Sequence, residues 1–512
     1  MRAHFDLAVI GSGPAGQKAA IGAAKLSKRV AIIEARACIG GVCTHTGTIP
    51  SKAIREAVLH LTGFRMRSVY GVSYQVKRDV SMADLIFRVE HVVRIETDVI
   101  RAQLQRNNVT CLYGPASFVD PHTLAIAAAD GEDRITADFI VIATGTVPAR
   151  PADVPFDGER IIDSDGLIHM ERLPRSMLIV GGGVVGTEYA CMLAALGVRV
   201  TLVDGRPRLL EFVDAEISEA LQYQMRLMGV RLRLGETVDA IRRANEHVEA
   251  VLASGKKLHA ETLLYAVGRQ GNTARLNLAA AGLSADDRGR LKVDDHYRTD
   301  VPHIFAAGDV IGFPSLASTS MEQGRLASFN AFGGDVVSDR KLLPYGIYTI
   351  PEVSMVGPNE QELTKNLVPY EVGIARYREI ARGQLVGDES GMLKLLFHQQ
   401  TRKLLAVHII GEGATELVHI GQAIMACAAD IDYFVNTVFN YPTLAECYKV
   451  AALDGINRML SARPTLRAGL SPARLADVNG STRDVPLMPA PAEATAAPAQ
   501  TAPAAAIAGT RR

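Results

Sequence analysis

Two glycine-rich segments have the spacing that binds the phosphates of a dinucleotide. In the first, Gly11, Gly13 and Gly16 follow an apolar, strand-like run that ends at Ile10. The first glycine of this pattern permits a tight turn, the second lets the backbone approach a pyrophosphate, and the third lets a helix pack on the strand. The helix N-terminus then offers free N–H groups to the phosphates. Glu34, at the end of the next strand-like run, can accept hydrogen bonds from a ribose diol, so we expect a nucleotide site here.

The second glycine-rich segment repeats this pattern far downstream. Gly181, Gly183 and Gly186 follow the strand-like run Met177–Val180, and a helical stretch then leads to a strand that closes on Asp204. A lone glycine motif is weak evidence, because glycine-rich turns also occur for structural reasons. Two complete units of strand, helix and acid indicate two dinucleotide sites.

The loop after the second motif carries two opposing signals for nucleotide choice. Asp204 suits the ribose 2′-hydroxyl of NAD, whereas Arg206 and Arg208 could make charge-assisted bonds to the 2′-phosphate of NADP. An enzyme that accepts both nucleotides in turn would need such a compromise. The alternative is that the arginines are solvated loop residues.

The residues of the two glycine motifs must be positioned by strands and helices. The hydrophobic pattern of the sequence predicts where these strands and helices lie. Both glycine motifs lie in β-α-β units, and later segments add a long amphipathic helix and an α+β texture after about residue 345. The expected elements are strands Leu7–Ile10, Val200–Val203, Met392–Phe397 and Leu404–Ile410, and helices Asp84–Arg106 and Thr415–Ala426.

One segment gives a specific resemblance. Residues 40–52 read Gly-Gly-Val-Cys-Thr-His-Thr-Gly-Thr-Ile-Pro-Ser-Lys, which resembles the active-site segment of the flavin disulfide reductases. The resemblance extends to about Leu460, and it implies an FAD cofactor and a nicotinamide nucleotide bound against the flavin. It places Asp309 on the ribityl chain, and Lys52 beside flavin N5 in a pair with Glu188; the alternative for this pair is an ordinary surface contact. Four further residues are expected to bind cofactor: Thr144, Gly145, Gly268 and Gly308.

The resemblance also implies the domain plan of an α/β protein with two Rossmann-like dinucleotide-binding domains, for FAD and NAD(P), and a C-terminal α+β dimerisation domain. We expect an FAD-binding domain over residues 1–155, an NAD(P)-binding domain over 156–272, the second part of the FAD or central domain over 273–345, the dimerisation domain over 346–460, and a disordered Pro/Ala-rich tail over 461–512.

The chain departs from the flavin disulfide reductases at both halves of their catalytic unit. That family carries two cysteines five positions apart, whereas this chain has Cys43 and then Thr48, and a hydroxyl cannot form a disulfide. The family's histidine before Pro-Thr is replaced by Tyr441, although Glu446 remains five residues later. A phenol is a poor base at neutral pH. We therefore expect no thiol relay. Cys43 is then a small core residue, a flavin contact or a thiol that forms a sulfenic acid.

An electron pair that enters such a flavin has to leave through a second nucleotide. The sequence thus predicts transhydrogenation in two steps, from NADPH to the flavin and from the flavin to NAD, as in the soluble pyridine nucleotide transhydrogenases, which this chain resembles closely. The alternatives are an NAD(P)H oxidase or quinone reductase, and a flavin-bound redox sensor without turnover. The resemblance further implies at least a homodimer.

Composition excludes several other function classes. The 55 basic and 55 acidic residues give a formal net charge of zero, which does not favour nucleic acid or an anionic membrane as partner. Six cysteines in 512 residues do not form a disulfide framework, so we expect a reducing cytoplasm. No signal peptide or membrane span is expected.

Overall fold

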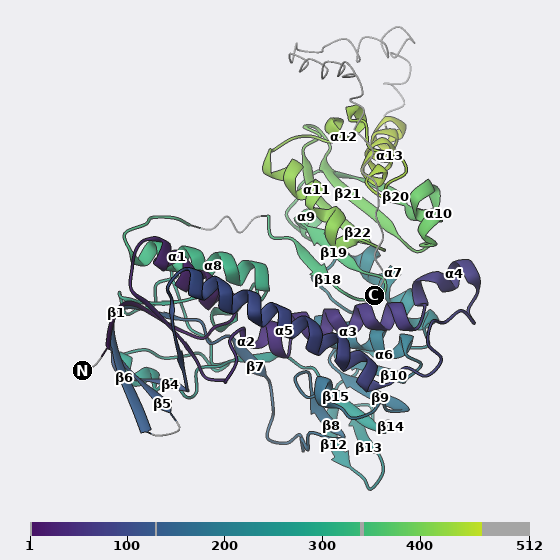
Figure 1. Cartoon of the computed structure of the whole chain (residues 1–512). Helices are drawn as coiled ribbons and strands as arrows, with labels where there is room; N and C mark the ends of the chain where they lie inside the picture. The colour runs from purple at the N-terminus through teal and green to yellow at the C-terminus, as the bar shows by residue number, and fades with distance from the viewer. Residues whose placement is uncertain (1–2, 129–130, 338–341, 463–512) are drawn as a thin grey trace, which may run out of the picture. The chain divides into compact units, whose positions relative to one another are not determined.

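The computed structural model describes residues 3–128, 131–337 and 342–462 (Figure 1). The predicted tail, apart from the end of the last helix, lies outside the described residues. None of the described helices combines the length and apolarity that a membrane crossing requires.

The first sheet surrounds the first glycine motif. Its strand order is β3-β2-β1-β6-β5-β4, and β17 pairs with β6; the strands β1, β2, β3 and β17 run parallel to their neighbours. The strands are β1 (Ala3–Ile10), β2 (Val30–Glu34), β3 (Thr110–Tyr113), β4 (Ala116–Asp120), β5 (Thr123–Ala128), β6 (Gly131–Ile142) and β17 (Ile304–Ala306). Helices α1 (Pro14–Lys25) and α8 (Ala317–Ala331) pack side by side against this sheet (Figure 1).

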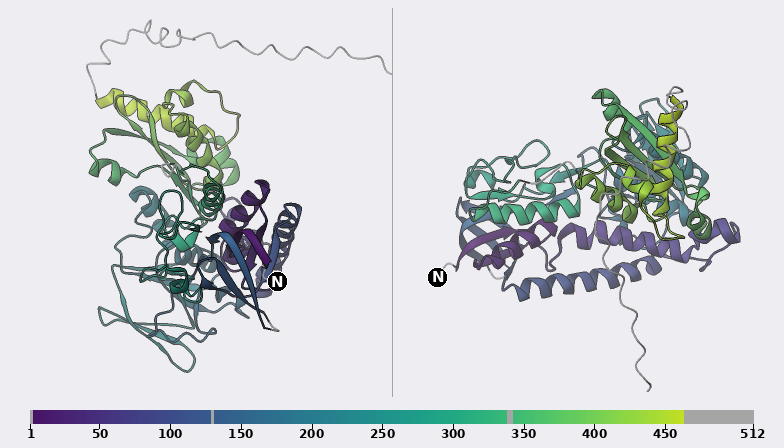
Figure 2. Two further views of the ribbon diagram at one scale, coloured as in Figure 1. Left: turned by 90° about the vertical axis from the view of Figure 1, so that its left-hand side faces the viewer. Right: turned by 90° about the horizontal axis from the view of Figure 1, so that it is seen from above.

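Between β2 and β3 in the sequence, the described residues form four α-helices, three longer ones and one short one. They are α2 (Gly41–His45), α3 (Thr48–Leu61) and α5 (Met82–Arg106), and the short α4 (Arg67–Tyr70) lies between the last two. Helix α5 packs along α3, as the right-hand view of Figure 2 shows. A capping box starts α5, because the side chains of Ser81 and Asp84 satisfy each other's backbone N–H groups.

The second sheet carries the second glycine motif. Its parallel strand order is β11-β10-β9-β15-β8, with a three-stranded antiparallel sheet, β12-β13-β14, beside it in sequence. The strands are β8 (Ile161–Asp163), β9 (Ser176–Val180), β10 (Arg199–Asp204), β11 (Arg231–Leu234), β12 (Val238–Arg243), β13 (Val248–Leu252), β14 (Lys257–Ala260) and β15 (Thr262–Tyr265), and the helices are α6 (Val184–Ala195) and α7 (Ala215–Leu227). Two short strands, β7 (Thr146–Pro148) and β16 (Arg269–Gly271), form an antiparallel pair. In sequence, β7 precedes and β16 follows the strands of the second sheet.

The C-terminal part is an antiparallel sheet with helices. Its strand order is β18-β19-β22-β21-β20. The strands are β18 (Tyr345–Ile347), β19 (Val353–Val356), β20 (Tyr370–Arg376), β21 (Met392–His398) and β22 (Leu404–Ile410), and the helices are α9 (Glu360–Lys365), α10 (Ala381–Val386), α11 (Ala414–Ala426), α12 (Asp432–Asn436) and α13 (Glu446–Ala462).

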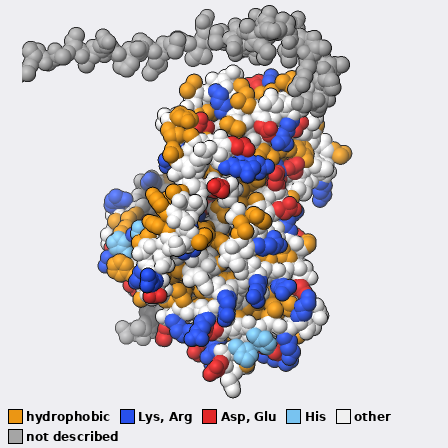
Figure 3. All heavy atoms as spheres, turned by 90° about the vertical axis from the view of Figure 1, so that its right-hand side faces the viewer, with side chains coloured by type: hydrophobic (Ala, Val, Ile, Leu, Met, Phe, Trp, Pro, Cys, Tyr) orange, Lys and Arg blue, Asp and Glu red, His pale blue; other side chains and the backbone are white. Residues whose placement is uncertain are grey.

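The elements predicted from hydrophobic periodicity are confirmed, with ends that differ by at most a few residues. The central strands are buried on both faces: Leu7, Ala8 and Val9 in β1 are fully inaccessible, as expected for parallel strands covered on both sides. On the surface, basic and acidic side chains are interspersed over much of the face in Figure 3, in keeping with the zero net charge.

Candidate functional site

A cavity of about 950 Å³ brings together the first glycine motif, the segment 41–52 and the 307–309 turn. Its walls come from the first glycine motif, the 41–52 segment, the start of α6, the 307–309 turn, the start of α8 and the region of β18. The predicted site residues that line it are Gly11, Gly13, Glu34, Cys43, Thr48, Lys52, Thr144, Gly145, Glu188, Gly308 and Asp309.

The first glycine motif has the backbone geometry that its spacing requires. Gly11 has a φ of +104°, and a Cβ there would overlap the backbone of Ala143. A Cβ at Gly16 would overlap the carbonyl oxygen of Gly11, so only glycine permits this approach of α1 to the strand end. The buried carboxylate of Glu34 accepts hydrogen bonds from Ser12 N at 3.1 Å and Ser12 Oγ at 2.5 Å, which fixes it at the cavity wall.

The polar groups around this cavity fit a flavin dinucleotide. Thr46 Oγ1 and Thr144 Oγ1 are buried without a hydrogen-bond partner among the described residues, and both threonines line the cavity. Such buried hydroxyls normally have a partner. Burial raises the pKa of Asp309, and the charge of Arg269 opposes this only in part. Its contacts with Thr146 and Ser320 are both long, 3.4 Å, so its carboxyl group is available to a ligand hydroxyl.

The predicted pairing of Lys52 with Glu188 is confirmed. Lys52 Nζ, on α3, lies 2.7 and 3.0 Å from the two carboxylate oxygens of Glu188, on α6. The Glu188 side chain is only 5% exposed, which rules out an ordinary surface pair. Tyr348 adds two contacts that the sequence did not predict: its N–H donates to Glu188 Oε1 at 2.8 Å, and its ring lies 4.9 Å from Lys52 Nζ. The ammonium group is thus held at the cavity wall.

Cys43 lies in the same cavity with no second thiol to react with. All six cysteines are among the described residues, and all are free. Burial raises the pKa of the Cys43 thiol, and a side-chain hydrogen bond with Thr48 offsets this only in part. The Cys43 thiol therefore lacks the lowered pKa that is typical of reactive cysteines.

We expect iodoacetamide to modify Cys43 in the FAD-loaded protein far more slowly at pH 7 than it modifies the exposed Cys38 and Cys427. Because the raised pKa keeps the thiol protonated, the rate at Cys43 should keep rising with pH up to at least pH 9. Cys38 and Cys43 lie on one tryptic peptide, residues 37–52, so tandem mass spectrometry with fragment ions that separate the two sites measures the labelling after timed exposure. Equal labelling of Cys43 at pH 6.5 and 8.5 would show a thiolate and contradict this expectation.

The second glycine motif has the same backbone geometry as the first. Gly181 has a φ of +108°, and a Cβ at Gly186 would overlap the carbonyl oxygen of Gly181. Gly183 is the N-cap of α6, and no neighbouring atom lies within 4 Å of the position of its Cβ. Pyrophosphate can therefore approach this turn as closely as it can the first.

At the end of β10, Asp204 and Arg206, which predicted opposite nucleotide preferences, form an ion pair with each other. Arg206 donates from Nε at 2.8 Å and from Nη2 at 2.7 Å to the two oxygens of Asp204, which also accepts from Gly182 N. Burial alone would raise the pKa of Asp204, but the bonds from Arg206 and Gly182 hold it below its ordinary value. Arg208 Nε is buried without a partner among the described residues. Eight predicted site residues are not among the described residues that line the large cavity: Gly16, Gly181, Gly183, Gly186, Asp204, Arg206, Arg208 and Gly268.

Comparison with known proteins identifies the family. Residues 5–324 match the sequence model of the pyridine nucleotide-disulphide oxidoreductases, and residues 343–452 match that of their dimerisation domain. The soluble pyridine nucleotide transhydrogenase of Mycobacterium bovis BCG Pasteur is 55% identical over 458 residues, or 89% of this chain and 98% of that relative. The chain belongs to the soluble pyridine nucleotide transhydrogenase family. A further transhydrogenase, from Vibrio vulnificus, is 46% identical over 464 residues, or 89% of this chain and 99% of its own.

Solved structures of similar chains confirm the predicted α/β fold class. The crystal structure of LpdA from Mycobacterium tuberculosis has a TM-score of 0.80 and 26% identity, and it covers 88% of this chain and 99% of its own. The HOCl-induced flavoprotein disulfide reductase RclA from Escherichia coli has a TM-score of 0.79, with 27% identity and the same two coverages. The transhydrogenase family therefore shares its fold with flavoproteins that reduce disulfides.

Tyr441 stands where the disulfide reductases have a histidine, and Glu446 is the acid that this chain retains. Tyr441 is 69% exposed, and Glu446 Oε2 is buried without a partner among the described residues. Among the described residues, the retained acid therefore has no side chain to orient.

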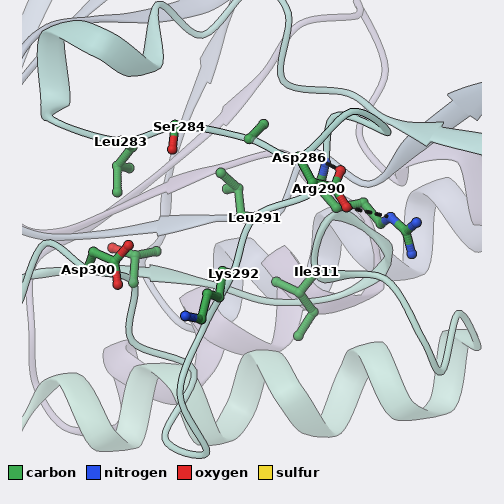
Figure 4. Close-up of a pocket in the computed structure, with 10 residues that line it drawn as sticks. Leu283, Ser284, Asp286, Arg290, Leu291, Lys292, Asp300 and Ile311 are labelled. Atoms are coloured by element: carbon green, nitrogen blue, oxygen red, sulfur yellow. Dashed lines mark hydrogen bonds and ion pairs between the residues drawn. The ribbon is translucent and has the colours of Figure 1, made fainter.

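Sequence reasoning missed several residues around the transhydrogenase cavity. The rings of Phe212, Phe313 and Tyr345 form a contiguous set at its wall, with centroid distances of 5.6 and 6.2 Å. They come from three distant segments, so no local motif could have marked them. A second, smaller cavity of about 400 Å³ lies between Leu283 and Ile311, where Asp286 pairs with Arg290 (Figure 4). It contains none of the motif residues.

Proposed function

We propose that this chain is a soluble FAD-dependent transhydrogenase that moves hydride from NADPH to NAD. The observation that supports this most strongly is the cavity itself, whose described lining combines the Lys52–Glu188 pair with one cysteine, Cys43, and with Thr48. The names of the relatives agree with this reading and not with an oxidase, a quinone reductase or a sensor without turnover.

Each part of the site has a defined task in this proposal. FAD, when bound, takes up hydride from one nucleotide and gives it to the next. The first glycine motif and Glu34 hold its pyrophosphate and ribose, and Asp309 holds the ribityl chain. Lys52, oriented by its ion pair with Glu188, would stabilise negative charge on the flavin ring. The second motif, with Gly181, Gly183 and Gly186, holds whichever nicotinamide nucleotide is present.

The functional test follows electrons from one nucleotide to the other. Purified protein is reduced with NADPH under argon, a thio-analogue of NAD is added, and flavin and analogue absorbance are recorded together. The flavin should bleach and then recover as the analogue is reduced, while lipoamide and glutathione disulfide cause no recovery. Recovery with oxygen alone at the same rate would support an oxidase instead, and a flavin that never bleaches would support the sensor.

Nucleotide choice is expected to depend on the Asp204–Arg206 pair. Arg206→Ala should lower kcat/KM for NADPH roughly tenfold to a hundredfold, because a charge-assisted contact to the 2′-phosphate is lost, and should not lower kcat/KM for NADH, because Asp204 is then free of the ion pair. Steady-state kinetics with both donors measure this, and the exposed Arg231 on β11, changed to alanine, is the control. Equal losses for both donors would refute a role in choosing between them.

Restoring the missing sulfur alone should not restore disulfide reduction. Thr48→Cys returns the family's second cysteine, but Tyr441 still stands where the base would be, so reduction of lipoamide should stay below roughly a thousandth of the transhydrogenase rate. Assays with lipoamide and with the thio-analogue on the same preparation measure both. Brisk lipoamide reduction by this variant would contradict the assigned loss of the base.

The dimerisation domain supports a homo-oligomer, and we propose at least a dimer that contacts through residues after about 346. A cytoplasmic location is proposed from the six free cysteines.

A further inference from the structure

The helix that carries Lys52 also carries a buried arginine. Arg55 follows Lys52 by three positions on α3, so the two side chains are neighbours on the helix surface. The Arg55 side chain is only 2% exposed. Arginine is almost never buried to this extent unless its charge is paired.

The partners of Arg55 come from the dimerisation domain and from its own helix. Its Nε donates to Thr349 O at 3.0 Å, and its Nη1 lies 3.3 Å from Glu352 Oε1 and 2.7 Å from Glu56 Oε1. Glu352 is 8% exposed, whereas Glu56 is 53% exposed. The pair with Glu352 is therefore the buried one.

Glu352 is fixed from its other side as well. Its Oε2 accepts from Thr415 Oγ1 at 3.0 Å and from Thr415 N at 3.3 Å, in the first turn of α11. Its carbonyl oxygen accepts from Gly411 N at 2.9 Å. The carboxylate thus joins α3 to α11 of the dimerisation domain.

The same short segment contacts the redox pair. Residues 348–352, between β18 and β19, provide Thr349 O and Glu352 to Arg55, and they also provide the Tyr348 N–H that binds Glu188 and the ring beside Lys52. Lys52 and Arg55 therefore contact opposite ends of one segment. A shift of this segment would change the position of the N–H group that orients Glu188.

We propose that the Arg55–Glu352 pair is a positioning pair for the redox site: by docking the 348–352 segment on α3, it holds the Tyr348 N–H on Glu188 and so keeps Lys52 in place. This deepens the proposed function and rests on it. It assigns no contact with the substrate to either residue.

The test uses the FAD-loaded protein and variants that separate positioning from stability. Arg55→Met and Glu352→Gln each break the pair, and the double variant Arg55→Met/Glu352→Met removes both charges, so that no carboxylate is left buried and unpaired. The matched control is Lys394→Met, which removes a buried cation whose ion pairs among the described residues are with Asp214, Glu216 and Glu360, none of them in the 348–352 segment.

Two quantities are measured on each variant and normalised to its bound flavin: the limiting rate of flavin reduction by NADPH and the reduction potential of the flavin. Stopped-flow reduction by NADPH should show a limiting rate at least tenfold below wild type in all three pair variants, with the Kd for NADPH within twofold. A dye-equilibrated reductive titration, which needs no nucleotide, should show a more negative flavin potential, because the ammonium group no longer stabilises the reduced ring as well. Lys394→Met should lower the melting temperature and leave both readouts unchanged.

The result that overturns the proposal is a wild-type potential and limiting rate in the double variant with only a lower melting temperature. Such a result would show that the Arg55–Glu352 pair stabilises the fold without positioning the Lys52–Glu188 pair. Failure of wild-type protein to reduce the thio-analogue would refute the transhydrogenase function instead, and the potential titration would still decide the role of Arg55.

Discussion

Replacing Lys52 by methionine is expected to slow flavin reduction by NADPH by about a hundredfold to a thousandfold, the usual loss when a fixed charge is removed from the site where charge develops. Methionine keeps the length of the side chain but removes the ammonium group that Glu188 and Tyr348 hold in place. Stopped-flow absorbance of the FAD-loaded variant at saturating NADPH measures the rate. Glu188→Gln, which keeps the lysine but weakens its orientation, should cost roughly tenfold.

The matched control for Lys52 is Lys77, whose ammonium group pairs with Asp84 on the surface. Lys77→Met should keep the wild-type rate. A rate within threefold of wild type in Lys52→Met, with FAD still bound, would remove the lysine from the catalytic residues.

The second large effect is on stability. Lys394 is 1% exposed on β21 and contacts Asp214 at 2.9 Å, Glu216 at 3.1 Å and Glu360. Because Asp214 is fully buried, Lys394→Met leaves a buried carboxylate without its cation. We expect a loss of about 3–5 kcal/mol in the free energy of unfolding. Urea denaturation followed by fluorescence and by far-UV circular dichroism measures it.

The pH dependence of this loss has a definite sign. Burial alone would raise the pKa of Asp214, but its interactions with His408, with the Lys394 ammonium group and with the Glu360 N–H outweigh burial and hold the pKa below its ordinary value. A depressed carboxylate pKa contributes stability above the unfolded pKa of roughly 3.9 and loses it as pH falls through the folded pKa. The unfolded state is the same in both proteins, so the difference follows the folded pKa of Asp214, which burial raises in Lys394→Met and which the cation helps to lower in wild type. The difference should therefore shrink as pH falls below neutral, from the folded pKa of the variant towards that of wild type. A difference that stays constant from pH 7 to pH 3.5 would show that the carboxylates are not its cause.

The sequence predicted those parts of the fold and site that depend on neighbours along the chain. Gly11 and Gly16 predict a turn because the backbone conformation and the helix contact arise within six residues. Periodicity likewise located α5 and β22, whose apolar spacing is set by a single element. The pairing of Lys52 with Glu188 spans 136 positions and was accessible only through resemblance to a family.

Other features could not be read from the sequence, because they depend on where distant segments meet. Nothing local distinguishes Arg55 from the exposed arginines, and its burial follows only from the docking of the 348–352 segment. Similarly, Asp204 and Arg206 predicted two opposing preferences, but their bidentate contact depends on the conformation of the loop after β10.

The closed contact between Asp204 and Arg206 has a consequence for turnover. If NAD binds the Asp204 carboxylate and NADP binds the Arg206 guanidinium group, as we propose, either dinucleotide must first open this ion pair. The same opening step thus weakens both ligands, and only the open fraction of molecules binds. When the product nucleotide leaves, the ion pair closes again and competes with its rebinding. Such a site binds each nucleotide less tightly, but it exchanges NADP for NAD faster.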